Sequence, residues 1–281
     1  MEKEGVLAVI LEVVGSGVAL ALASLPLLGW RWRLDMRIVF SGSFVIGGTA
    51  GGIALLIDYL WVDLSIIFVL LTELCLIFIL VFIFVAVRFY RDPERIPTET
   101  ENVILSPADG KIIYVNEIEG GSSLTSTKGK RRFKLYEVMA TEPPPNTAYL
   151  IGIDMNILNV HVNRSPMSGK IVLQKHIKGS FLSLRRPESE TRNERVTTIV
   201  DNGQFRIVVI QIASRLVRRI VSYLKEGDMV AIGQRIGMIA FGSQVDVAIP
   251  QLDNLKITVK PGDQVRAGVS IVARHGLQEC V

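Results

Sequence analysis

The chain is poor in the residues that build metal sites and disulfide frameworks. Among its 281 residues there are only two cysteines and three histidines. Cys75 lies inside an apolar run and Cys280 is one residue from the end, which argues against a disulfide between them and against a metal-ligand cluster. The sequence also lacks helix-turn-helix, zinc-finger and RNA-binding signatures, and its net charge of +4 is mild. We therefore predict no metal and no nucleic-acid partner.

Charged residues are also scarce in the first 87 residues. The whole chain is 49% hydrophobic with a mean hydropathy of +0.39. A bilayer core needs roughly 20 apolar residues per helix. Three apolar stretches reach about that length, at 6–29, 38–57 and 64–87. The sequence predicts a membrane anchor over 1–90 with three transmembrane helices, followed by a globular domain over 91–281.

The first apolar stretch has a rival interpretation as a secretory signal peptide. It begins with the net acidic Met1-Glu-Lys-Glu4 and lacks a small-residue cleavage site before a soluble domain, which favours a retained anchor. We interpret Glu12 and Glu73 as facing each other or reaching an interface, with a pathway through the membrane as the alternative. Small residues of the second stretch predict close helix packing: Gly42, Gly47, Gly48, Gly51 and Gly52.

The charges that flank the spans predict an orientation. The first connection carries three arginines against Asp35, the second carries Asp58 and Asp63, and three arginines follow the third span. By the positive-inside rule, the first connection and the large domain lie in the cytoplasm at the cell membrane.

The region after Asn102 is rich in short β-type runs bounded by turn residues. Helical spacing of apolar residues over 212–224 predicts one helix. Residues 119–148 contain a basic cluster and three consecutive prolines, which we interpret as a long surface excursion. The predicted strands are 103–105, 111–115, 149–153 and 205–210.

An internal repeat organises the C-terminal part. The Lys-x-Gly-Asp-x-Val pattern at 225–230 recurs at 260–265, with an offset of 35 residues. Paired Gly-Asp turns between short buried strands are typical of a barrel-sandwich hybrid fold, as in lipoyl and biotinyl carriers. The region between the repeats offers Ser243 and no modifiable lysine. The predicted fold is therefore a set of transmembrane α-helices followed by a mainly β (α+β) domain with a hybrid-barrel-like C-terminal part.

Five separated segments together resemble one family. They are Arg88-Phe-Tyr-Arg-Asp-Pro-Glu-Arg95, Ser106-Pro-Ala-Asp-Gly-Lys111, Val160-His-Val-Asn-Arg-Ser-Pro-Met-Ser-Gly169, Asn193-Glu-Arg195 and Phe241-Gly-Ser-Gln-Val-Asp246. In this order they look like the short form of phosphatidylserine decarboxylase, and the resemblance covers about residues 80–275. It implies a lyase made as a zymogen that acts in phospholipid biosynthesis.

The resemblance implies that the chain makes its own cofactor, a covalent pyruvoyl group derived from Ser243. The Ser243 hydroxyl would attack the carbonyl of Gly242, elimination would release 1–242, and hydrolysis would leave a keto group on residue 243. That keto group serves as the electron sink that a decarboxylase needs. The two fragments, 1–242 and 243–281, are expected to stay associated. Four other Gly-Ser pairs exist, at 15–16, 42–43, 121–122 and 179–180, but only 242–243 has the family's flanking residues and position.

Further site residues follow from the resemblance. Asp109 matches the aspartate that activates self-cleavage, with a simple turn aspartate as the alternative. His161 matches the first of two family histidines, but the second position holds Arg164, which is a poor general base. Either His161 serves both cleavage and catalysis, or His176 joins it.

The substrate implied is a membrane phospholipid with a serine headgroup. Asn193, Arg195 and His176 are the expected substrate-binding residues, since an arginine fork suits a carboxylate or a phosphate. One alternative is a non-enzymatic membrane adaptor built on a lipoyl- or biotinyl-like barrel, and another is a pyruvoyl enzyme for a soluble amino acid. The choice between ester (phosphatidyl) and archaeal ether (archaetidyl) lipids, and a homo-oligomeric state, remain open from the sequence.

Overall fold

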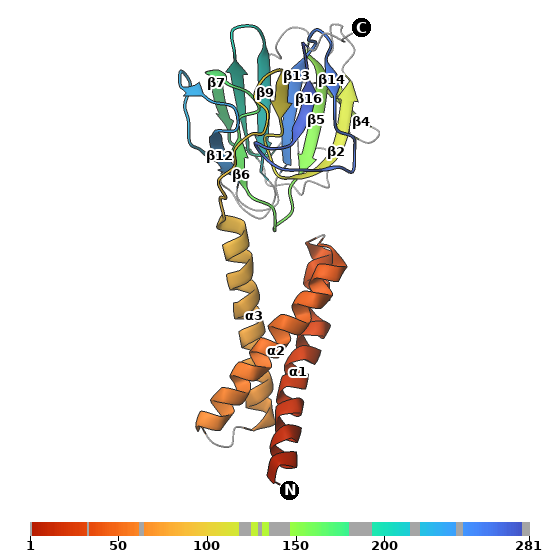
Figure 1. Cartoon of the computed structure of the whole chain (residues 1–281), viewed down its shortest axis with the longest axis vertical. Coiled ribbons are helices and arrows are strands. Elements are labelled where there is room, and N and C mark those ends of the chain that lie inside the picture. Colours follow the sequence, from red (N-terminus) through yellow and green to blue (C-terminus); the bar gives the residue numbers. More distant parts are fainter. Residues whose placement is uncertain are drawn as a thin grey trace. The chain divides into compact units, whose positions relative to one another are not determined.

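The computed structural model divides the chain into two compact units, Met1–Phe89 and Tyr90–Val281 (Figure 1). Gly242 and Ser243, the predicted cleavage site, lie outside the described residues. The structure describes residues 2–32, 34–61, 65–117, 125–128, 131–134, 147–179, 193–213, 220–239 and 244–276.

The first unit consists of three long helices. They are α1 (Glu2–Arg31), α2 (Met36–Trp61) and α3 (Ile66–Tyr90). All three are long and apolar enough to cross a membrane, so each predicted span coincides with one apolar helix. α1 and α2 extend a few residues beyond both ends of their apolar stretches, whereas α3 begins two residues after the start of its stretch and ends three residues beyond it.

Small residues bring α1 and α2 into close contact. A Cβ atom built on Gly17 would lie 2.6 Å from the carbonyl oxygen of Gly47, and one on Gly51 would lie 2.8 Å from that of Val13. No atom within 4 Å would meet a Cβ on Gly42, Gly48 or Gly52. The predicted small-residue packing is therefore confirmed, and only Gly47 and Gly51 of the five expected glycines carry it.

The two glutamates of the anchor do not face each other. Glu73 is fully buried and accepts hydrogen bonds from the Ser16 hydroxyl at 2.8 and 3.0 Å, whereas Glu12 is exposed. Our interpretation of a facing pair was wrong, because the neighbouring helix already offers Glu73 a hydroxyl.

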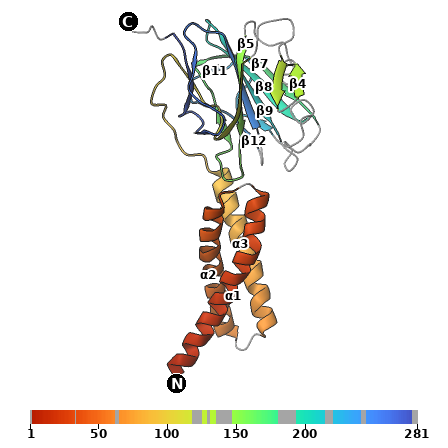
Figure 2. The same ribbon diagram turned by 90° about the vertical axis from the view of Figure 1, so that its right-hand side faces the viewer.

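The second unit is built from β-strands (Figures 1 and 2). One sheet has eight strands in the order β11-β7-β8-β9-β13-β5-β2-β15. Two three-stranded sheets have the orders β1-β16-β14 and β10-β12-β6, and β3 pairs with β4. The strands are β1 (Val103–Leu105), β2 (Gly110–Glu117), β3 (Thr125–Lys128), β4 (Arg131–Lys134), β5 (Thr147–Asp154), β6 (Val162–Arg164), β7 (Gly169–Ile177), β8 (Arg195–Asp201), β9 (Arg206–Ile212), β10 (Ile220–Ser222), β11 (Met229–Val230), β12 (Arg235–Ile239), β13 (Gln244–Pro250), β14 (Lys256–Ile257), β15 (Gln264–Val265) and β16 (Ile271–Arg274).

All four strands predicted from the sequence are present, as β1, β2, β5 and β9. The helix predicted over 212–224 is wrong: Ile212 ends β9 and 220–222 form β10, while 214–219 lie outside the described residues. The β-branched Ile220 and Val221 pair instead with Ile239 and Met238 of β12, so tertiary pairing overrides the local spacing. Within 119–148, the described residues are those of the paired strands β3 and β4 and the first two residues of β5.

The eight-stranded sheet has an internal two-fold pattern. β11, β7, β8 and β9 form one half, and β15, β2, β5 and β13 form the other in mirrored order. The repeated turns are equivalent, because Lys225 N–H bonds to Asp228 Oδ2 and Lys260 N–H to Asp263 Oδ2, both at 2.9 Å. Gly227 and Gly262 have φ values of +97° and +105° in these turns, a region that only glycine enters easily.

A second repeat accompanies the first. Ser106-Pro-Ala-Asp-Gly-Lys-Ile112 corresponds to Ser165-Pro-Met-Ser-Gly-Lys-Ile171. In both copies the serine hydroxyl donates to a backbone carbonyl two residues later, at 2.7 Å. Val265 pairs with Gly110 as Val230 pairs with Gly169. The domain is thus two similar halves, each joining one Ser-Pro turn to one Gly-Asp turn.

Both faces of the central sheet are buried. The larger apolar cluster includes Ile153, Val196 and Val245, together with residues of the two small sheets. The second cluster includes Leu150, Ile210 and Ala248. Because side chains alternate along a strand, these clusters lie on opposite faces, which we call the first face and the second face. Strand β13 is buried along its whole length.

Candidate functional site

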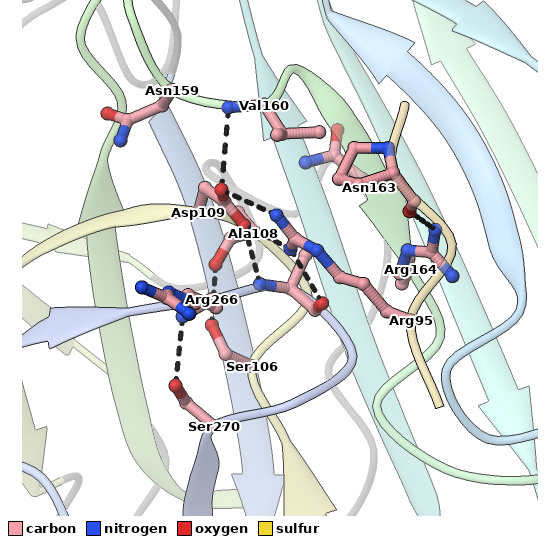
Figure 3. Close-up of polar contacts among 12 residues, drawn as sticks. Arg95, Ser106, Ala108, Asp109, Asn159, Val160, Asn163, Arg164, Arg266 and Ser270 are labelled. Carbon is pink, nitrogen blue, oxygen red and sulfur yellow. Dashed lines mark hydrogen bonds and ion pairs between the residues drawn. The ribbon is translucent and has the colours of Figure 1, made fainter. Parts of the chain in front are cut away.

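Asp109 lies in the Ser-Pro turn that leads into β2, and it is 5% exposed. Its Oδ1 accepts the N–H of Ala267 at 2.8 Å, and its Oδ2 accepts the N–H of Val160 at a long 3.4 Å. The turn therefore holds a carboxylate between two backbone segments that are far apart in the sequence (Figure 3).

Arg95 forms a bidentate ion pair with the same carboxylate. Its two terminal nitrogens lie 2.5 Å and 2.9 Å from Oδ1 and Oδ2 of Asp109. The first nitrogen also donates to the carbonyl of Ala267 at 2.9 Å, which closes a ring of three residues (Figure 3). A fork-shaped guanidinium fixes both the position and the plane of a carboxylate. Sequence reasoning did not assign Arg95 to the site, although it stands in one of the family-like segments.

His161 directly follows Val160 and is fully buried. Its Nδ1 lies 2.9 Å from the carbonyl oxygen of Asn159. Because a carbonyl only accepts, Nδ1 carries the hydrogen and Nε2 carries the lone pair in the neutral ring. Burial lowers the pKa of His161 to about 4, while the Asn159 carbonyl and Asp109 oppose that shift. The imidazole is therefore neutral, and basic at Nε2, at physiological pH.

The residues on either side of the predicted cleavage site are firmly held. Ile239, the last described residue before Gly242, donates its N–H to the carbonyl of His161 at 3.1 Å. Gln244, which directly follows Ser243, pairs with Asp154 of β5 on one side and Ile212 of β9 on the other. The predicted cleavage site therefore lies between the end of β12, which is hydrogen-bonded to His161, and the start of β13, which is in the middle of the eight-stranded sheet.

Arg164, at the position of the second family histidine, has a different role. Its guanidinium donates to the carbonyl of Gly233 at 3.0 Å, to the carbonyl of Pro93 at 3.0 Å and to Asp92 at 3.2 Å. Asp109 has Arg95, and not a histidine, as its charged partner. Burial also lowers the pKa of the Arg164 guanidinium.

Asn193 and Arg195 form a second group at the start of β8. The Asn193 side chain donates to the carbonyl of Ala213 at 2.9 Å, so it supports the backbone. Arg195 is 7% exposed, donates to the carbonyl of Asn193 at 3.2 Å, and has a pKa lowered by burial. It pairs with Ile212, which pairs in turn with Gln244, so this cation lies two strands from the residue after Ser243.

The structure does not gather all predicted residues on one side of the sheet. Arg195 alternates with Val196 of the first face and so belongs to the second face. The strand after His161, β6, lies over the first face, where Gln211 donates to Asn163 at 2.8 Å. Asp109 and His161 therefore form one group and Asn193 and Arg195 another.

His176 is half exposed on β7 and lies 2.8 Å from Glu194 Oε1. The pair belongs to the strand end near Asn193 and Arg195, because His176 is opposite Val196. His176 therefore lies at the same strand end as the second group, but on the first face, opposite to the face of Arg195.

A buried polar network that sequence reasoning missed follows the predicted cleavage site. Tyr114 donates its hydroxyl to Asp246 at 2.7 Å, and the Gln244 amide donates to Asp246 at 2.8 Å and to Tyr114 at 3.1 Å. The alternation of Gln244 and Asp246 along the strand was the only signal for it. Among the described residues, no group of three or more His, Cys, Asp or Glu is arranged to hold a metal ion.

Comparison with known proteins identifies the family of the chain. The family model of phosphatidylserine decarboxylase matches residues 82–273. A protein of Methanocaldococcus jannaschii assigned as an archaetidylserine decarboxylase proenzyme is 44% identical over 187 residues, which is 66% of this chain and 88% of the relative. A phosphatidylserine decarboxylase proenzyme of Chlorobium chlorochromatii is 37% identical over 200 residues, 70% of this chain and 82% of the relative. The chain therefore belongs to the phosphatidylserine decarboxylase family of carboxy-lyases.

Proposed function

We propose that this protein is a membrane-bound proenzyme that cuts itself between Gly242 and Ser243 and then decarboxylates a phospholipid with a serine headgroup. The observation that carries the proposal is the hydrogen bond from Ile239 to the carbonyl of His161. It ties the chain just before Gly242 to a buried, neutral histidine.

His161 is suited to act as the general base of self-cleavage. Its pKa of about 4 leaves Nε2 unprotonated at neutral pH, and the Asn159 carbonyl fixes the tautomer. Arg164 remains protonated and is engaged with Gly233 and Pro93, so it does not compete for this role.

The cleavage chemistry balances with the residues of the chain and one water molecule. The Ser243 oxygen attacks the Gly242 carbonyl carbon, the amide C–N bond breaks, and the hydroxyl proton passes through His161 to the freed nitrogen. A base then removes the α-hydrogen of residue 243 and the ester Cβ–O bond breaks, which leaves Gly242 as a carboxylate. Water hydrolyses the remaining enamine, and ammonia departs.

The residues present fit the pyruvoyl group that this cleavage leaves on residue 243. The group supplies an electron sink for the carbanion that decarboxylation creates. The chain holds it at the head of β13, which is bonded on both sides and buried throughout. Such a rigid strand keeps a reactive group in one position.

Arg195 is our candidate for binding the anionic headgroup. A buried guanidinium two strands from Gln244 attracts a carboxylate or a phosphodiester, and Asn193 supports its backbone. His176 with Glu194 lies at the same strand end and is a further candidate for headgroup contact. We propose the three-helix anchor as the reason that a lipid substrate reaches the domain, with the domain on the cytoplasmic side of the membrane.

The test is the intact mass of the purified chain beside a Ser243→Ala variant. The wild-type chain is expected as two fragments of 242 and 39 residues (281 − 242 = 39), the smaller with a keto-blocked start. The Ser243→Ala chain stays whole. Ser180→Ala, in another Gly-Ser pair, serves as the control and cuts normally. A single intact wild-type chain in the membrane would contradict self-processing.

The substrate is tested on the processed enzyme in mixed micelles. Ester and ether lipids with a serine headgroup are each expected to release carbon dioxide, because the reacting atoms are the same, and their relative rates identify the preferred tail. Free serine at the same concentration is the control. Equal turnover of free serine would favour an amino-acid decarboxylase instead.

A further inference from the structure

The segment that directly follows α3, residues 91–95, reaches both parts of the Asp109–His161 group, and we call it the strap. Arg95 binds Asp109, and Arg91 donates to the carbonyl of Leu158 at 2.9 Å, in the turn that leads to His161. Asp92 accepts from Arg164 and Arg235. Glu94 also accepts from Arg235, at 2.5 Å, so charged groups fasten the strap at four of its five positions.

The internal symmetry of the domain shows what the fold alone requires at position 109. The equivalent residue in the other half is Ser168, whose hydroxyl accepts the N–H of Ile232 at 2.9 Å. Asp109 Oδ1 accepts the N–H of Ala267, the residue equivalent to Ile232, at 2.8 Å. One neutral oxygen thus suffices to close this turn. The turn does not require the second oxygen of Asp109, the negative charge of its carboxylate or its ion pair with Arg95.

Oδ2 of Asp109, the oxygen that the turn does not require, is directed toward the segment that contains His161. Oδ2 of Asp109 receives one nitrogen of Arg95 at 2.9 Å and faces the N–H of Val160, the residue before His161 (Figure 3). Because Arg95 holds both oxygens and also the Ala267 carbonyl, the carboxylate cannot turn away from Val160 without breaking the bidentate pair. The negative charge also favours a proton on His161.

We propose that Arg95 is a positioning residue for self-cleavage: it holds the Asp109 carboxylate against the His161 segment, so that the strap is part of the processing site. This inference rests on the proposed function, because it concerns the same cleavage at Gly242–Ser243. Arg95 acts through Asp109 and does not itself touch the reacting atoms.

The experiment follows cleavage of the full chain, synthesised into lipid nanodiscs, over time. Arg95→Gln is expected to slow cleavage about a hundredfold, the loss typical of a misplaced catalytic group. Arg95→Lys keeps the charge but not the fork, so an intermediate rate is expected. Arg274→Gln is the matched control. It breaks another bidentate pair, at 2.6 and 2.7 Å to Glu99, away from Asp109, and is expected to cut within about twofold of wild type.

The double variant Arg95→Gln with Asp109→Ser separates positioning from folding. Each single change leaves one charge buried without its counterpart, whereas the double change removes both and leaves the turn that Ser168 already forms. The double variant is expected to melt closer to the wild type than either single variant, yet to cut no faster than Asp109→Ser. Cleavage of Arg95→Gln or of the double variant at the wild-type rate overturns the inference. A wild-type chain that never cuts overturns the proposed function instead.

Discussion

His161 combines complete burial with a fixed tautomer, and this combination decides its chemistry. Water normally stabilises an imidazolium, and its removal lowers the pKa of the ring to about 4. The Asn159 carbonyl accepts the hydrogen bond from Nδ1–H, so the basic lone pair of the neutral ring is on Nε2. His176, which is half exposed beside Glu194, lacks this burial.

The burial of His161 also predicts a pH dependence of stability. An unfolded chain binds a proton on this residue below about pH 6.5, whereas the folded chain does so only below about 4, so protons favour unfolding between these values. The free energy of unfolding is expected to fall by at most about 3 kcal/mol from this residue between pH 7 and pH 4.

The measurement is the melting temperature of the uncut Ser243→Ala chain against pH. His161→Gln in that background is the control, since an amide does not titrate, and its melting temperature should fall less between pH 7 and pH 4.5. Parallel curves for the two chains would mean that His161 is protonated equally easily in the folded and the unfolded state.

Among the elements, the α1–α2 pair depends on a few glycines. A side chain at Gly47 would press on the carbonyl of Gly17 and on the backbone of Val18, at 2.6 and 2.7 Å, whereas one at Gly48 would meet nothing within 4 Å. Gly47→Leu is therefore expected to separate the helices and to destabilise the anchor by about 1–3 kcal/mol, the usual cost of overpacking.

Gly48→Leu is the matched control, because it adds the same side chain one position along the same helix. A cysteine pair placed across the α1–α2 contact reports the separation through its rate of disulfide crosslinking in detergent. The Gly47 variant should crosslink more slowly than the Gly48 variant. Equal rates would indicate that the helices do not pack through Gly47.

The elements that the sequence predicted well are those with a strong local pattern. The three spans and the strands β1, β2, β5 and β9 are continuous apolar or β-branched runs, and they were found. The helix over 212–224 failed because residues 220–222 are only three positions long and are fixed by partners at 237–239. A pairing of that kind leaves no periodic trace in the chain.

The site was predictable where the residues carry a motif, and not where they act through geometry. Asp109 and His161 could be selected because they stand in recognisable segments. Arg95 also stands in such a segment, but the segment does not show its role, because its partners Asp109 and Ala267 are 14 and 172 positions away in the sequence. The repeat of Ser106–Ile112 in Ser165–Ile171 was the available signal, because the two copies differ at only two positions and one of them sets the charged Asp109 against the neutral Ser168.

At the scale of the whole molecule, the flanking charges predict which side of the membrane the large domain occupies. In a chain with Cys75→Ser and Cys280→Ser, Lys260→Cys places one thiol on an exposed turn of the domain, and Ser65→Cys places one in the second connection. In intact cells a membrane-impermeant maleimide is expected to label Ser65→Cys and not Lys260→Cys. Permeabilised cells provide the control. The reverse labelling would place the domain outside.

The position of β13 predicts how the molecule behaves after cleavage. The 39-residue fragment (281 − 242) that the proposed cut would produce begins one residue before this strand and also contains β14, β15 and β16. β13 lies between β5 and β9 in the middle of the large sheet, and all of its residues are buried. Separation of the fragments would expose both neighbouring strands and open the core, so the cut chain is expected to remain one folded unit.

This expectation is checked by chromatography of the processed protein in detergent. The two fragments should elute together and separate only in denaturant. Val247→Asp would bury an unpaired charge in the core of β13, since Val247 is 0% exposed, and single buried charges of this kind cost several kcal/mol. Thr258→Asp, on an exposed residue of the same fragment, is the control and should leave the fragments together. Spontaneous separation of the wild-type fragments would mean that β13 does not stay paired with β5 and β9 after cleavage. The sheet would then not hold the pyruvoyl group proposed on residue 243.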